Sequence, residues 1–191
     1  MGMDVYGLNP TIKNGSVKPS MSNFKDLTDE ERQHYFDETE KYESDNPGVY
    51  FRANVWRWRP LWQYACDLMH DAFTQEDIAG GSVNSGYAIT SDKASVLSER
   101  MEMAIEANAH HMYERDYKAM QDSLPQVECE ICDGVGMRQY EREENITELA
   151  PCNSCDGSKL RDDWRKSYPF YAETVEEFAL FVKNSGGFEI R

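Results

Sequence analysis

The sequence has few basic residues and no long apolar run. Its 20 lysines and arginines stand against 35 aspartates and glutamates, so the net charge is −15 over 191 residues. A general nucleic-acid-binding protein normally carries a basic face, and this composition makes direct nucleic-acid binding a poor expectation. The N-terminus has no basic-then-apolar signal region, and no apolar stretch approaches the length of a membrane span. We therefore expect a protein that works away from membranes.

Common catalytic motifs are missing as well. The sequence contains no glycine-rich phosphate loop before a helix, no His-Glu-x-x-His and no Gly-x-Ser-x-Gly. Of the four histidines, His110 lies one helical turn from Glu114, and this pair could contribute to a second metal site. Placement of the pair on the surface is the favoured interpretation. Whether the protein is an enzyme stays open, and catalysis is not favoured because no nucleophile, base or activated water is visible.

The sequence does contain a cysteine pattern typical of metal sites. Four of the five cysteines form two Cys-x-x-Cys pairs, with nineteen residues between the pairs. This spacing is that of a four-thiolate structural zinc site. We predict one structural zinc ion with the ligands Cys129, Cys132, Cys152 and Cys155. Thiols arranged for metal also favour the reducing cytoplasm.

Two alternatives to zinc remain for these cysteines, a disulfide and a redox-active Cys-x-x-Cys. A redox motif needs one pair beside a βαβ pattern, whereas here two pairs flank a polar spacer that reads as a hairpin with arms at 137–140 and 145–149. The spacer has little apolar content, so the segment should depend on its metal to fold, with about 10 kcal/mol or more from zinc binding. Cys66 lies among apolar residues and is expected to be a reduced, half-buried thiol.

The first cysteine pair also has a recognisable sequence context. Cys129-Glu-Ile-Cys132-Asp-Gly134-Val-Gly136 resembles the Cys-x-x-Cys-x-Gly-x-Gly repeat of the cysteine-rich zinc domain of DnaJ-type co-chaperones. The second pair follows the repeat up to Gly157 but has Lys159 where the last glycine belongs. That family carries four repeats and two zinc ions, so the two repeats here are enough for one ion. The resemblance covers about thirty residues, implies a zinc-binding fold, and comes without the His-Pro-Asp signature of a J-domain.

The remaining periodicities predict an α+β fold that is mainly helical. We expect a small helical domain with short terminal strands and an inserted zinc-knuckle hairpin. The expected organisation is an N-terminal strand and flexible loop at 1–27, a helical body at 28–126, a zinc-binding module at 127–158, and a C-terminal helix and strand at 159–191 that complete the body.

Individual elements follow from caps and apolar spacing. Capping boxes at Thr28 and Thr174 predict helices that begin just after them. The first, at about 29–43, carries eight acidic residues when Asp45, just past its end, is counted. Apolar residues at helical spacing predict a core helix at about 60–73 that starts with Pro60, and one long helix at about 91–121. Strands are expected at 3–9, 49–55 and 188–190.

The best candidate for a second site is a basic-aromatic cluster in an otherwise acidic chain. Arginines beside tryptophan rings can stack on a flat ring or hold an anion in bidentate fashion. The candidate ligand-binding residues are Arg52, Asn54, Trp56, Arg57 and Arg59, with Trp58 among them. A nucleotide-like anion could be bound or processed there. The favoured alternative makes the tryptophans core and pairs the arginines with the acidic helix.

Three further segments, MDVYGLNP, GVYFRANVWRWRPLW and FVKNSGGFEI, together resemble a family of uncharacterised proteins of bacteria and bacteriophages. The resemblance implies a bacterial or phage protein, in the host cytoplasm if phage-encoded. From all of these features we expect a zinc-stabilised binding or adaptor protein, such as a phage accessory factor that engages a host protein with a basic surface. The small-molecule site is the first alternative, and an acidic mimic of nucleic acid is the second.

Overall fold

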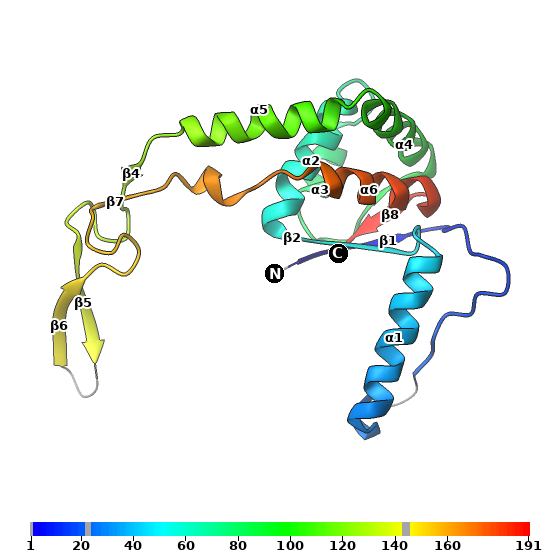
Figure 1. The fold of residues 1–191 in the computed structure, drawn as a ribbon, viewed down its shortest axis with the longest axis horizontal. Coiled ribbons are helices and arrows are strands. Elements are labelled where there is room, and N and C mark those ends of the chain that lie inside the picture. Colours follow the sequence, from blue (N-terminus) through cyan, green and yellow to red (C-terminus); the bar gives the residue numbers. More distant parts are fainter. Residues whose placement is uncertain (1, 22–23, 143–145) are drawn as a thin grey trace. The chain divides into compact units, whose positions relative to one another are not determined.

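The computed structural model describes residues 2–21, 24–142 and 146–191, and its fold is α+β and mainly helical, as predicted (Figure 1). The described helices are α1 (Asp29–Asp45), α2 (Val55–Leu68), α3 (Gln75–Gly81), α4 (Ser91–Glu106), α5 (Ala109–Ser123), α6 (Ala172–Ser185) and the 3₁₀ turns η1 (Phe24–Asp26) and η2 (Trp164–Ser167). The described strands are β1 (Gly2–Gly7), β2 (Tyr50–Asn54), β3 (Tyr87–Ile89), β4 (Val127–Glu128), β5 (Met137–Arg142), β6 (Ile146–Pro151), β7 (Leu160–Arg161) and β8 (Phe188–Ile190).

The chain forms two compact units. The main unit runs up to Glu114 and resumes at Phe170, and the cysteine unit is Arg115–Pro169. Helix α5 begins in the first and ends in the second. Within the part of the chain that the structure describes, no helix has the length and apolar character to cross a bilayer.

The main unit contains a four-stranded sheet in the order β2-β1-β8-β3, with every neighbouring pair antiparallel. The central strand β1 pairs Val5 with Phe51 on one side and with Ile190 on the other. Met3 and Val5 are buried and alternate with more exposed neighbours, as expected for a sheet with one face on a core. The strands expected near both termini and at 49–55 are therefore confirmed. The sequence analysis missed the edge strand β3.

An aromatic core lies between this sheet and the helices. Trp58 and Phe178 meet edge to face with ring centroids 5.6 Å apart, and Phe178 meets Phe188 in the same way at 5.8 Å. Trp58 is fully buried, and its indole N–H donates to the carbonyl of Gly81 at 2.8 Å. A buried indole that keeps its hydrogen bond adds apolar area without a desolvation penalty. Trp58 is therefore core, as the favoured alternative for the basic-aromatic cluster predicted. That alternative is wrong for Trp56, which is exposed. It is also wrong for the acidic helix, since Arg52 pairs with Asp4 of β1 and Arg57 contacts Tyr171.

The helix expected at 60–73 is displaced in the structure. Helix α2 begins five residues earlier, at Val55, because the side chain of Asn54 accepts the N–H of Arg57 at 2.9 Å and caps its first turn. Pro60 lies inside the helix rather than at its start. The expected C-terminus is also wrong, since α2 ends at Leu68.

The single helix expected at 91–121 is two helices. The break lies between α4 and α5, where Asn108 adopts a left-handed backbone conformation with φ of 57°. Asparagine tolerates this region better than most residues, so the chain can turn there without a glycine. The break sets the start of α5, and with it the position of His110.

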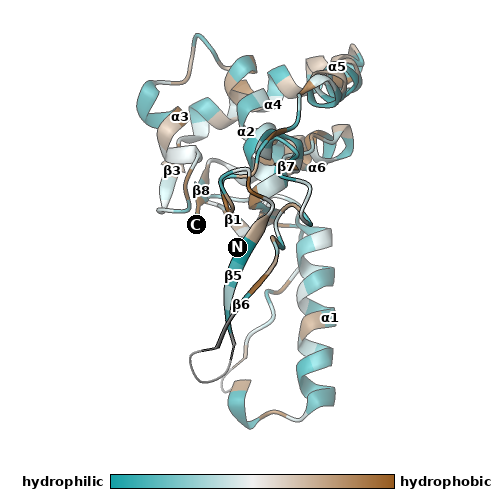
Figure 2. Cartoon of the chain, turned by 90° about the vertical axis from the view of Figure 1, so that its left-hand side faces the viewer, coloured by the Kyte–Doolittle hydropathy of each residue, from teal (hydrophilic) through white to brown (hydrophobic). Residues whose placement is uncertain are grey.

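The two predicted capping boxes have different outcomes. Thr28 caps α1 and exchanges hydrogen bonds with Glu31, as predicted. None of the residues of α1 is buried, and Figure 2 shows hydrophilic colours along most of the helix. The box at Thr174 is wrong, because α6 begins at Ala172, whose N–H donates to a carboxylate oxygen of Glu114 at 3.3 Å. A carboxylate from another helix thus satisfies an N-terminal donor of α6.

Candidate metal centre

Each Cys-x-x-Cys pair forms the same tight turn. In the first, the N–H of Gly134 donates to the carbonyl of Cys129 at 3.1 Å, and in the second, Gly157 donates to Cys152 at 3.3 Å. After each cysteine pair, three residues have left-handed backbones, and their φ angles in the two turns are similar. They are Asp133 (47°), Gly134 (67°) and Gly136 (82°) in the first, and Asp156 (48°), Gly157 (78°) and Lys159 (72°) in the second. Lys159 therefore adopts the backbone conformation that the repeat assigns to glycine.

The two turns are joined by reciprocal backbone hydrogen bonds. The N–H of Cys152 donates to the carbonyl of Gly136 at 2.9 Å, and the N–H of Cys129 donates to the carbonyl of Lys159 at 2.9 Å. The short antiparallel pair β4–β7 closes the segment at its base, and β5–β6 forms the predicted hairpin. Of the hairpin arms predicted at 137–140 and 145–149, Asn145 lies outside the described residues.

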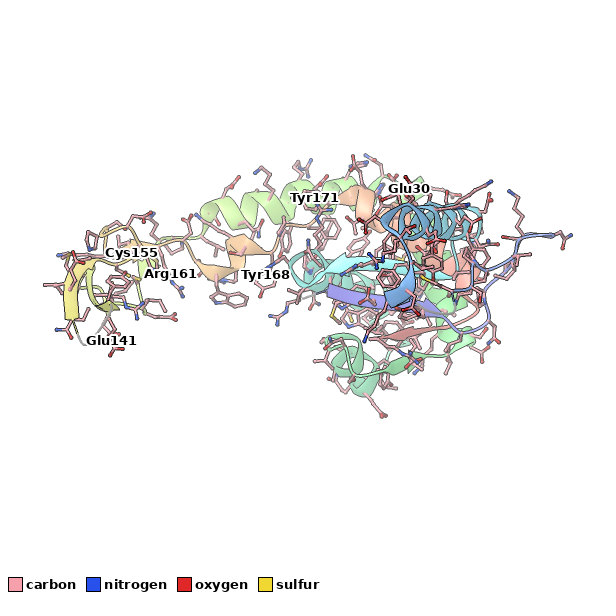
Figure 3. All side chains as sticks on the ribbon, turned by 90° about the horizontal axis from the view of Figure 1, so that it is seen from below. Glu30, Glu141, Cys155, Arg161, Tyr168 and Tyr171 are labelled. Carbon is pink, nitrogen blue, oxygen red and sulfur yellow. The ribbon has the colours of Figure 1, made fainter. Side chains whose placement is uncertain are left out.

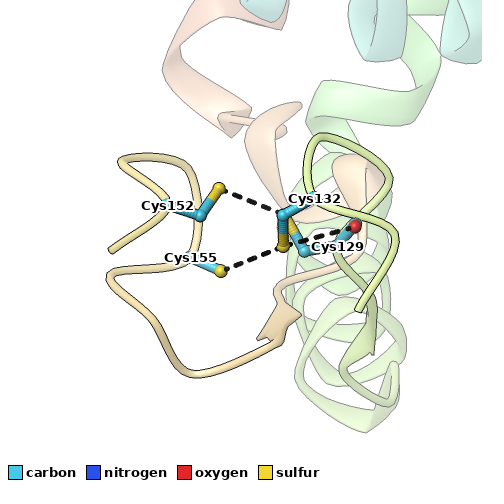
Figure 4. A group of neighbouring side chains, drawn as sticks. All are labelled: Cys129, Cys132, Cys152 and Cys155. Carbon is cyan, nitrogen blue, oxygen red and sulfur yellow. Dashed lines mark hydrogen bonds between the residues drawn. The ribbon is translucent and has the colours of Figure 1, made fainter. Parts of the chain in front are cut away.

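Figure 4 shows the four sulfur atoms facing one another between the two turns. The Sγ atoms of Cys129 and Cys152 are 3.9 Å apart, those of Cys132 and Cys155 are 3.7 Å apart, and all four lie within 4.8 Å of one another. Disulfide sulfurs would be about 2.05 Å apart, and all of these cysteines are free. An ion with four tetrahedral sulfur bonds of about 2.3 Å separates its sulfurs by about 3.8 Å. The four thiols therefore have the spacing of a tetrahedral metal site and can hold one ion.

The electrostatics of the thiols also favour a cation. Burial raises the pKa of the Cys132 thiol to about 11. Burial acts in the same direction on Cys129, but hydrogen bonds from the backbone N–H of Ile131 and from the thiol and backbone N–H of Cys132 outweigh it and lower the pKa of Cys129 to about 7. Sulfur atoms 3.7–3.9 Å apart cannot all be ionised together unless a positive charge lies among them, because like charges repel at this distance. A bound metal ion supplies that charge.

The cysteines are also nearly all of the interior that this unit has. Among the described residues of the cysteine unit, the buried ones are the four cysteines together with Gly136 and Asp163. A segment of this size without apolar side chains to bury cannot offset its conformational entropy by hydrophobic burial. Metal binding by the four thiols would supply stabilisation that apolar burial in this unit does not.

Polar contacts also join the β5–β6 hairpin to the second cysteine turn. Figure 3 labels Glu141, Cys155 and Arg161 of this unit. The Tyr140 hydroxyl donates to the carbonyl of Pro151 at 3.1 Å and accepts the N–H of Asn153 at 2.8 Å, which ties the hairpin to the second turn. These contacts hold the turns in place from outside the sulfur cluster.

The predicted ligand-binding residues of the main unit separate in the structure. Arg52, Asn54 and Arg57 line an open groove of about 460 Å³ with Gly2, Ala53, Thr174 and Glu177. The guanidinium of Arg52 lies 3.5 Å from Asp4, and that of Arg57 stacks on Tyr171 at 4.8 Å from the ring centroid. Trp56 is exposed and, like Arg59, does not line the groove. Ligand binding by these residues stays a prediction.

Cys66 is buried, free and outside the sulfur cluster, and burial raises its pKa to about 12. It is an inert core thiol, as the sequence indicated, and is more deeply buried than expected.

Comparisons with known proteins find no family model, no curated protein and no solved structure that matches the chain. The similarities to DnaJ-type repeats and to bacterial and phage proteins thus rest on the sequence motifs alone.

Proposed function

We propose that the ion is zinc and that its role is structural. Tetrahedral sites with four thiolates are typical of zinc and of iron, and closed zinc sites of this kind stabilise folds. With four protein ligands the ion has no open position for a water or a substrate, which argues against hydrolytic chemistry at this site. The observation that carries the proposal is the separation of 3.7–3.9 Å between paired sulfurs.

We further propose that the zinc-held turns present a surface to a protein partner. Ile131 and Val135 lie in the loop that carries the first cysteine pair, and their side chains are 45% and 62% exposed. Trp164, in the same unit, is also exposed. Zinc would fix the backbone of these side chains, so a partner would meet a rigid apolar surface at a low entropic cost. The net charge of −15 favours a partner with a basic surface, because opposite charge speeds the encounter.

The resemblance to bacterial and phage proteins supports a bacterial cell as the source of that partner. The test is affinity capture from bacterial lysate with wild type, Val135→Ser and Cys132→Ser. Val17→Ser is the matched control, because Val17 is 82% exposed and lies in the main unit. We expect a partner that wild type and Val17→Ser capture and that Val135→Ser and Cys132→Ser lose, while Val135→Ser keeps one zinc per chain. Retention of every captured protein by both variants of the cysteine unit would contradict the proposal.

The groove at Arg52 and Arg57 supports a second candidate, the binding of a nucleotide-like anion. Two guanidinium groups at one open groove can hold an anion, although Glu177 in its lining opposes one. A thermal-shift series with nucleotides at millimolar concentration tests this, since a saturating ligand raises the melting temperature. We expect any such shift to be lost in Arg57→Ala, and no shift with any nucleotide would rule out this candidate.

A further inference from the structure

A second group of metal-ligating side chains lies in the main unit, outside the sulfur cluster. His110 and His111 are in the first turn of α5, and Glu176 is on α6. One ligand atom from each of the three lies within 4.8 Å of those of the other two. The sequence analysis paired His110 with Glu114 and favoured a surface position, which is wrong for His110 because this side chain is buried. It missed Glu176, which is 66 residues away from His110. Only the break at Asn108 and the packing of the helices bring these groups together.

The distances in this group fit a shared ion. Nε2 of His110 is 3.1 Å from Oε1 of Glu176, and Nε2 of His111 is 4.0 Å from the same oxygen. Nitrogen and oxygen ligands about 2.1 Å from an ion lie about 3.0–3.4 Å apart for angles between 90° and 109°. The first pair already has this separation. The second needs a shift of about half an ångström, within reach of exposed side chains.

Glu114 has the position of a supporting group. Its Oε2 lies 3.6 Å from Nδ1 of His111, while its Oε1 accepts the N–H of Ala172 at 3.3 Å. A carboxylate near one ring nitrogen favours a proton there and leaves the lone pair of the other nitrogen for a metal. Glu114 therefore favours the tautomer of His111 in which Nε2 can bind an ion.

Burial makes part of this group rigid and leaves part open. The side chain of His110 is 2% exposed, and its ring centroid is 4.3 Å from that of His111. The side chains of His111 and Glu176 are 48% and 50% exposed. An ion could thus enter from solvent, bind one fixed and two adjustable ligands, and keep water in its remaining positions.

We propose that His110, His111 and Glu176 form a binding site for a second divalent transition-metal ion. Two imidazoles and one carboxylate suit zinc, cobalt or nickel, and they differ in softness from the four thiols of the structural site. The competing interpretation is a plain hydrogen bond from Nε2 of His110 to Glu176. The two differ in whether the zinc-loaded protein binds one more ion.

The test uses the full chain with one zinc already bound and titrates it with Co²⁺. We expect one further ion per chain, with the weak visible absorption of nitrogen and oxygen ligation. Sulfur-to-cobalt charge-transfer bands in the near ultraviolet would instead show exchange into the cysteine site. The supporting role predicts that Glu114→Gln weakens Co²⁺ binding by about 10–100-fold. Removal of a ligand in His111→Ala should weaken it at least as much.

The matched control is His34→Ala. Nδ1 of His34 lies 3.8 Å from Glu38 on α1, and among the described residues this pair is not part of a group of three metal-ligating side chains. Co²⁺ binding should be unchanged in this variant. Glu176→Gln keeps the size of a half-exposed side chain and should lose the additional ion without loss of fold. Absence of a second cobalt in the wild type, or equal losses in His34→Ala and His111→Ala, would overturn the proposal and leave the zinc proposal untouched.

Discussion

Replacement of Lys159 by glycine should strengthen the zinc-held fold. Lys159 and Gly136 occupy equivalent places in the two turns, with φ of 72° and 82°, and their carbonyls accept equivalent hydrogen bonds. The first turn has glycine at this place and the second has a side chain with a Cβ. The second turn therefore contains strain that the first avoids.

The size of the effect follows from the backbone. A left-handed conformation costs a non-glycine residue about 1–2 kcal/mol, and the greater freedom of glycine in the unfolded chain returns about 0.5–1 kcal/mol of this. Lys159→Gly should therefore stabilise the cysteine unit by about 1 kcal/mol. The reverse change, Gly136→Ala, should destabilise the cysteine unit by more than this. The alanine would have to adopt a left-handed backbone, and its Cβ would also lie 2.7 Å from the carbonyl oxygen of Gly157.

The assay is competition for zinc between the protein and a chelator. Because metal binding and folding are coupled, 1 kcal/mol of fold stability changes the apparent zinc affinity by about fivefold. Lys159→Ala is the control, since it removes the ammonium group and keeps the Cβ. If Lys159→Ala tightened zinc binding as much as Lys159→Gly, charge rather than backbone strain would be responsible. Weaker zinc binding by Lys159→Gly would refute the reasoning.

Three further predictions concern the two units separately. Cys132→Ser should lose zinc and unfold the cysteine unit with the main-unit helices largely retained by circular dichroism, whereas Cys66→Ser keeps one zinc; full zinc content in the first variant would contradict the site. Phe178→Ala should cost the main unit about 3–5 kcal/mol in denaturant unfolding, with zinc content unchanged, since it opens a cavity in the aromatic core. Burial raises the pKa of Asp77, but hydrogen bonds from the Lys93 ammonium and neighbouring hydroxyl groups outweigh burial. The pKa of Asp77 is therefore lowered to about 2, against about 3.9 in the unfolded chain. The stability that Asp77 contributes to the main unit should thus be complete above about pH 4 and be lost as the pH falls toward 2. Asp77→Asn should lower the free energy of unfolding by about 2 kcal/mol and flatten this acid dependence. An unchanged pH profile would show that the ion pair does not contribute.

The cysteine site could be predicted because its information is local. A Cys-x-x-Cys turn is set by a few consecutive residues, and Gly134 and Gly157 mark the left-handed positions that follow each pair. The capping box at Thr28 is local in the same sense. The terminal strands were visible from short apolar runs, although which strands pair was not.

The misplaced helix boundaries show where local signals compete. Pro60 favours a helix start, but the cap supplied by Asn54 starts α2 earlier. Thr174 and Glu177 have the spacing of a capping box, but α6 begins before them, at Ala172, whose N–H donates to a carboxylate on another helix. In the second case the deciding partner, Glu114, is 58 residues away along the chain, so the sequence around the helix could not reveal it.

The sequence by itself determined that two Cys-x-x-Cys turns exist, that a helix begins after Thr28, and that the chain is acidic and mainly helical with short strands. Only the tertiary structure decided that Trp58 is core while Trp56 is exposed, and that His110 meets Glu176. The physical reason is range. Turn geometry and capping depend on neighbours a few residues away, whereas burial and ligand clusters depend on the packing of elements that are far apart along the chain.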